Sequence, residues 1–93
     1  MVLTIPVNKY INKYLQPQVS RLTQVEKALN DAGSVLEAAA TAQILDAMVS
    51  AIKDLVDAGV ESVYFEKEEF TEFLRTIKET EDAYEELLQE LGS

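Results

Sequence analysis

Apolar residues recur at intervals of three and four along three segments of similar length, and this periodicity limits what the chain can fold into. Such spacing places the apolar side chains on one face of an α-helix. It predicts helices over about 6–30, 34–58 and 66–91. Because 93 residues make one domain, we expect a single all-α domain, an antiparallel three-helix bundle with a tight turn over 31–33 and a longer second connection over 60–65.

The first segment contains Pro17, which has no amide hydrogen and crowds the carbonyl of Lys13. The apolar positions keep their phase across the proline. We therefore expect the first helix to be kinked at Pro17 or split there into two nearly collinear helices, the second with Pro17 in its first turn. The apolar face comprises Val7, Ile11, Leu15, Val19, Leu22, Val25 and Leu29.

The second segment has clear signals at both ends. Ser34 and Glu37 have the spacing of a capping box, in which each side chain binds the other residue's amide. Gly59 is suited to a left-handed helix end. Because apolar residues cover much of the circumference, we expect this helix to be the central one. Its inner face is predicted to be Ala38, Thr41, Leu45, Met48, Ile52 and Leu55, widened by Ala40, Ile44, Ala47 and Ala51.

The third segment has a broad apolar face that supports two interpretations. Its residues either pack on the second helix as core, or leave part of the face exposed to recruit a partner helix or a second copy. Acidic residues crowd its last turns, where they oppose the helix dipole, so we expect this end to need a partner or a basic neighbour. The candidate interface is Phe73, Ile77, Tyr84, Leu88 and Leu91.

Two short runs outside the helices, 2–5 and 62–65, are rich in residues that favour strands. They predict either a minor two-stranded ladder or an apolar plug beneath the ends of the bundle. A ladder of two strands is weak without support.

The net charge of −9 is unevenly distributed, at +3 over residues 1–30, −4 over 31–60 and −8 over 61–93. Direct nucleic-acid binding is not expected, because phosphates need lysine and arginine. The acidic third helix is expected to attract the basic first helix, or a basic protein. The candidate acidic face is Glu79, Asp82 and Glu86.

Residue types needed for most catalysis are missing. The chain has no histidine and no cysteine, so its five serines have no imidazole to activate them. Carboxylates at helical spacing can bind a divalent metal, but a solvated acidic face is the simpler interpretation. We expect no enzymatic activity, no metal and no cofactor.

The sequence shows neither a signal peptide nor a membrane-spanning segment. The first ten residues lack a basic stretch followed by a long apolar one. The longest apolar stretch, 38–45, lies between Glu37 and Asp46, whereas a spanning helix needs about 20 mostly apolar residues. We expect a cytoplasmic protein.

Three functional hypotheses follow. The first is a non-enzymatic interaction or assembly protein that acts through helix packing, with itself or with another protein. The second is an acidic inhibitor that mimics nucleic acid, of a viral or mobile-element type. The third is a helical hydrolase that uses carboxylates and a metal.

Overall fold

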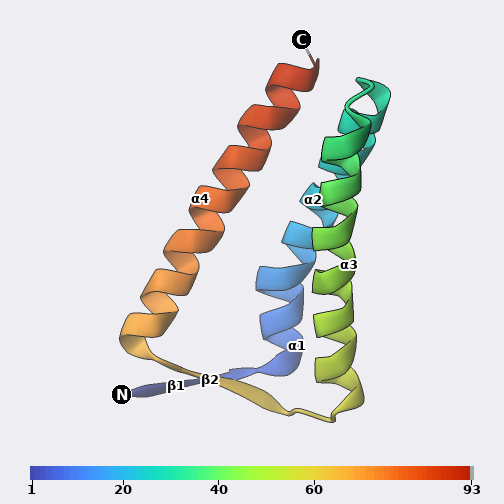
Figure 1. Cartoon of the computed structure of the whole chain (residues 1–93). Coiled ribbons are helices and arrows are strands. Elements are labelled where there is room, and N and C mark those ends of the chain that lie inside the picture. Colours follow the sequence, from blue (N-terminus) through green and yellow to red (C-terminus); the bar gives the residue numbers. More distant parts are fainter. Residues whose placement is uncertain (93) are drawn as a thin grey trace.

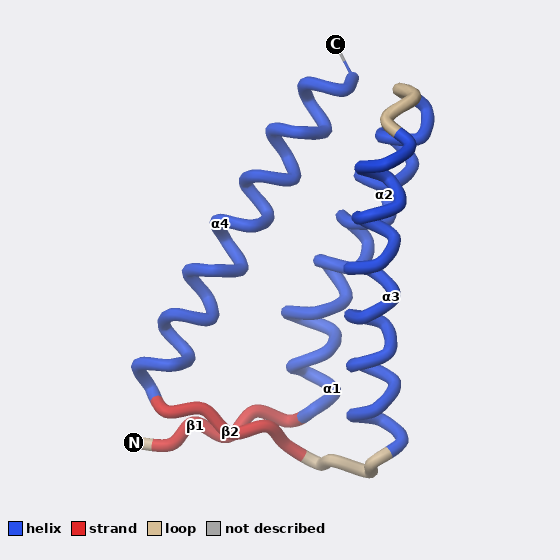
Figure 2. Tube along the Cα trace, viewed as in Figure 1, coloured by secondary structure: helices blue, strands red, loops and turns tan. Residues whose placement is uncertain are grey.

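The chain forms three long helical segments closed at one end by a two-stranded antiparallel sheet (Figures 1 and 2). The computed structural model describes residues 1–92. This arrangement confirms the predicted helical bundle with a minor ladder. The elements are β1 (Val2–Pro6), α1 (Val7–Tyr10), the π-helix η1 (Ile11–Leu15), α2 (Gln16–Asp31), α3 (Val35–Asp57), β2 (Ser62–Glu66) and α4 (Lys67–Gly92).

The first helical segment is continuous from α1 through η1 to α2, and Pro17 lies in the first turn of α2. Just before the proline, the amide of Gln16 donates to the carbonyl of Ile11, five residues back. The wider π-turn accommodates Pro17, which has no amide hydrogen to donate to the carbonyl of Lys13. The side chain of Gln18 also donates to the carbonyl of Tyr14, at 3.0 Å.

Both connections that follow a long helix use a glycine with positive φ, Gly33 at 81° and Gly59 at 68°. After α2, the amide of Ser34 donates to the carbonyl of Leu29 at 2.9 Å, and the amide of Gly33 donates to Asn30 at 3.1 Å. The same pair of bonds closes α3. These are Schellman motifs, which reverse the chain sharply.

The predicted capping box is correct in position but wrong in its bonds. Ser34 is the N-cap of α3, yet its side chain makes no capping hydrogen bond. The amide of Ser34, which the Glu37 side chain was expected to reach, donates instead to the carbonyl of Leu29.

The ladder pairs β1 with β2 from Val2 opposite Glu66 to Pro6 opposite Ser62. Two further backbone bonds extend it, from Val7 to the carbonyl of Glu61 and from Lys67 to the carbonyl of Met1. Ile5 is buried, and the ring of Phe65 in β2 packs against aromatic side chains of the helices. This support explains why so short a ladder forms, and it decides between the two alternatives for these runs.

The central helix is α2, which corrects the expectation that the second long helix would be central. α2 packs against both α3 and α4, whereas α3 and α4 scarcely touch each other. Leu22, Val25 and Leu29 of α2 are buried, and Leu22 is only 1 % exposed. In α3 the one buried residue is Ala38. The sequence predicted a central position for α3 because apolar residues cover much of its circumference. In the structure, α2 is the one helix that packs along most of α3.

The bundle is open and elongated. It measures 46 × 27 × 17 Å, and its radius of gyration of 15.1 Å exceeds the roughly 12 Å typical of a compact domain of this length. Figure 1 shows α4 approaching α2 and α3 at its C-terminal end and diverging from α3 toward its own N-terminus.

Candidate interaction surfaces

The C-terminal half of the candidate interface on α4 lies against the core of the bundle. Val25, Leu29 and Ala38 form this core, and α4 packs against it with partly buried apolar residues. The contact explains how the acidic end of α4 remains helical to Gly92. The residues that α4 contributes are Tyr84, Leu87, Leu88 and Leu91.

The N-terminal half of that interface belongs to an aromatic cluster at the other end of the bundle. Phe73 lies 5.2 Å from the ring of Phe65, and 5.7 Å from each of the rings of Tyr10 and Tyr14. Burial raises the pKa of the Tyr10 phenol. The cluster joins α1, η1, β2 and α4, and its members are Tyr10, Tyr14, Phe65, Phe70 and Phe73.

The five predicted interface residues are therefore partly buried rather than free. Ile77 is half-buried on the same face of α4, between the two clusters in sequence. Their use by a partner stays a prediction. The structure shows their contacts within the chain.

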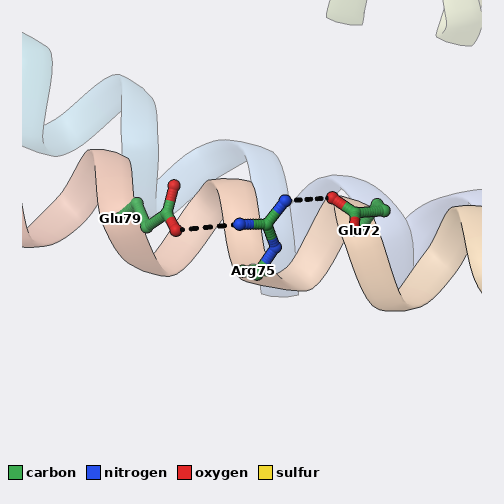
Figure 3. Close-up of polar contacts among 3 residues, drawn as sticks. All are labelled: Glu72, Arg75 and Glu79. Atoms are coloured by element: carbon green, nitrogen blue, oxygen red, sulfur yellow. Dashed lines mark hydrogen bonds and ion pairs between the residues drawn. The ribbon is translucent and has the colours of Figure 1, made fainter.

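The predicted acidic face is exposed along α4. Glu79, Asp82 and Glu86 all lie at the surface. Glu79 accepts a hydrogen bond at 3.2 Å from Arg75, which also donates to Glu72 (Figure 3). The hydrogen bond and the charge of Glu72, followed by the charge of Glu79, raise the pKa of Arg75. One guanidinium thus offsets part of the negative charge on this helix.

The expected attraction between the basic first helix and the acidic third one is present as an ion pair. Arg21 of α2 donates to Glu85 of α4 at 2.6 Å. Both side chains are partly exposed, so the pair contributes at most about 1 kcal/mol. Within residues 1–92, no group of three or more acidic side chains is arranged to hold a metal ion.

Five of the nine large apolar side chains that are exposed among the described residues lie on α3, which the sequence predicted to be the central helix. The inner face predicted for this helix does face α2, with Ala38 buried and the others half-buried. The additional line Ala40, Ile44, Ala47 and Ala51 is exposed. Large apolar side chains at the surface of α3 are Val35, Leu36, Ile44, Val49 and Val56.

One line of α3 is buried at its start and exposed at two later positions. Its residues follow the four–three spacing of a helix-packing seam, and we call them the α3 seam: Ala38, Ala42, Leu45, Val49, Ile52 and Val56. Ala38 is 3 % exposed beneath the last turns of α4, whereas Val49 is 48 % and Val56 60 % exposed. Ala42, Leu45 and Ile52 are half-buried, the last two on the face toward α2, so the open positions of the seam are Val49 and Val56. The sequence already contained the signal for this exposed surface, because α3 has more apolar residues around its circumference than one neighbouring helix can cover.

By length and composition alone α3 is also apolar enough to cross a membrane, which corrects the sequence-based statement that no segment is. Asp46 lies at the middle of this helix, where a charged side chain costs about 2.5–3.5 kcal/mol in a bilayer. Glu37, Lys53 and Asp54 add to that cost. Packing against protein requires burial of only one side of α3 and leaves these charges in water.

A shallow, open depression at the start of α3 is lined by consecutive residues, from Gly33 to Glu37. Ser34 lies there without a histidine in the chain to activate it.

Comparison with known proteins gave no significant match to a family model, a curated protein or a solved structure.

Proposed function

We propose that this chain is a non-enzymatic interaction or assembly protein that binds a protein partner, another copy or a different chain, by helix packing. The observation that carries the proposal is the exposed apolar surface of α3. Contiguous apolar surface on a folded domain marks interaction sites. A helix whose remaining side accepts another helix is a common form of such a site.

The seam also has the geometry that helix packing requires. Its four–three spacing keeps Ala42, Val49 and Val56 in line along one edge of α3. β-branched valines lose little side-chain freedom when buried in a helix contact. Alanine allows the backbones to approach closely.

A matched pair of substitutions tests the proposal. Val49→Glu places a charge on the seam, whereas Ser50→Glu places the same charge on an adjacent exposed position that points about 100° away. The tagged full-length chain and both variants are used to capture protein from an extract of the source cells, and their self-association is measured separately by light scattering.

We expect the wild type and Ser50→Glu to retain a partner or to self-associate, and Val49→Glu to lose this binding. A wild-type chain that stays monomeric at every concentration and captures no protein would refute the proposal. So would turnover of a small molecule by the purified chain.

A second candidate function is the acidic inhibitor that mimics nucleic acid. It is favoured by the carboxylates exposed along α4, among them Asp82 and Glu86. Salt separates the two functions. Binding through α4 carboxylates weakens steeply as ionic strength rises, whereas binding through the α3 seam changes little.

A further inference from the structure

We propose that the partner on the α3 seam is a second copy of this chain, bound with the two α3 helices antiparallel about a twofold axis between Val49 and Ser50. This inference rests on the proposed function and specifies its surface and its partner. Three features of the described residues support it: the charges beside the seam, the charges on the opposite edge of α3, and the surface area of the chain.

The first feature is a pair of opposite charges on one edge of the seam. Asp46 and Lys53 are seven residues apart, so they lie on the same edge of α3, beside Val49 and Val56. Both are exposed. In the antiparallel arrangement they lie at equal distances from the axis, so Asp46 lies opposite the partner's Lys53, and Lys53 lies opposite the partner's Asp46.

This complementarity selects the antiparallel direction. In antiparallel helix pairs the same edge of each helix meets across the contact, and one acid and one base on that edge then pair twice. In a parallel pair in register, Asp46 would instead lie at the level of the partner's Asp46, and Lys53 at the level of the partner's Lys53. Neither pair would attract. At the centre of the antiparallel contact Val49 lies beside the partner's Val49, and Val56 lies about one residue, or about 1.5 Å along the helix, from the level of the partner's Ala42.

The other exposed edge of α3 has no such pair of opposite charges. It is formed by Leu36, Ile44 and neighbouring alanines. The charges that border it are Glu37 and Asp54, both acidic. Two copies joined through this edge would place acids near acids, which disfavours the contact.

The surface area of the chain is consistent with a missing neighbour. The accessible surface is 6346 Å², whereas a folded monomer of this mass is expected to expose about 5,400 Å². The excess of about 950 Å² is close to the roughly 800 Å² that each partner buries in an interface of standard size.

α4 of the same chain is poorly placed to cover the open part of the seam. Its first turns are held in the aromatic cluster, where Phe65, Phe70 and Phe73 contact one another and the tyrosines of α1 and η1. Figure 1 shows this end of α4 far from α3.

Charge reversal at the two positions tests the arrangement. Sedimentation equilibrium is measured on the full chain for the wild type, Asp46→Lys, Lys53→Asp, the double variant with both changes, and Asp54→Lys. The last is a matched control, because it makes the same charge change on an exposed residue of α3 away from the seam. Circular dichroism verifies that each variant keeps its helices.

We expect a reversible wild-type dimer. Each single reversal at position 46 or 53 turns two attractive contacts into two repulsive ones, and should raise the dissociation constant about tenfold. The double variant restores both pairs and should return to within about threefold of the wild type. Asp54→Lys should leave dimerisation almost unchanged. A mixture of the two single variants should form mixed dimers, because one carries two bases and the other two acids.

Several results would overturn the inference. One is a dimer that Asp46→Lys and Asp54→Lys weaken equally, and another is a double variant no better than the singles. A wild-type monomer at every concentration would also overturn it. If that monomer captures a different protein, or binds phosphatidylcholine vesicles, in a manner that Val49→Glu abolishes, another partner covers the seam. Capture of a protein leaves the proposed function standing, whereas a monomer that captures none refutes both.

Discussion

Replacing Leu22 with alanine measures whether α2 is the centre of this bundle. Leu22 is 1 % exposed, the lowest value among the large apolar residues. The matched control is Leu36→Ala in α3, where the same side chain is 87 % exposed. Both sites are helical, so the two substitutions differ mainly in burial.

The expected magnitudes follow from that difference. Removing the buried carbon groups of Leu22 loses about 0.8 kcal/mol for each, or about 2.4 kcal/mol, and the cavity raises the loss to about 3 kcal/mol. At Leu36 little apolar surface is covered, and alanine is the better helix former, so the change in the free energy of unfolding should stay below about 0.5 kcal/mol.

Urea unfolding followed by circular dichroism separates these outcomes. With a slope near 1 kcal/mol/M for a chain of this size, Leu22→Ala should lower the midpoint by about 2 to 3 M, and Leu36→Ala by less than about 0.5 M. Both are measured at the same low protein concentration, because dimerisation would add to the apparent stability. Equal losses, or a larger loss for Leu36→Ala, would refute the assignment of α2 as the central helix.

Three further predictions concern the turns and the aromatic cluster. Gly59→Ala should destabilise the chain by about 1 kcal/mol, because φ is positive there, while Gly92→Ala, at the helix end, should be nearly neutral in thermal unfolding. Phe73→Ala should cost about 2 kcal/mol, less than for a fully buried phenylalanine, and should reduce the near-ultraviolet dichroism of the cluster. Because burial raises the pKa of Tyr10 above its ordinary 10.0, the folded chain keeps a proton that the unfolded chain loses. The contribution of Tyr10 to the free energy of unfolding should therefore be constant below about pH 10 and fall as the pH rises further. Tyr10→Phe should lack this fall, and an unchanged alkaline profile would contradict the reasoning.

Local features of the fold were predictable from the sequence because they depend on neighbouring residues. Helical spacing placed the three long segments within about a residue of their observed ends. The positive φ at Gly59 followed from its place after a helix. The consequence of Pro17 was predicted as a kink or a split. The π-turn itself was not predicted, because it depends on the amide of Gln16 donating to the carbonyl of Ile11 rather than to that of Asn12.

The candidate surfaces were less predictable, because exposure depends on how helices are arranged. Phe73, Tyr84 and Leu88 belong to an apolar face that the sequence described correctly. Spacing alone does not say whether a neighbour from the same chain covers such a face. The strand tendency of 62–65 likewise left a ladder and a plug open, until pairing with β1 decided between them.

By itself the sequence determined that this chain is helical, acidic, and without the histidine and cysteine on which most catalysis relies, because these properties follow from residue type and short-range spacing. Only the tertiary structure decided that α2 is the centre and that Val49 and Val56 of the α3 seam are left exposed. The physical reason is that both α3 and α4 pack on α2 while the β1–β2 ladder and the aromatic cluster hold the start of α4 away from α3. A periodic apolar face shows which side chains of a helix favour burial. The arrangement of the other helices decides which of those side chains are covered and which stay exposed.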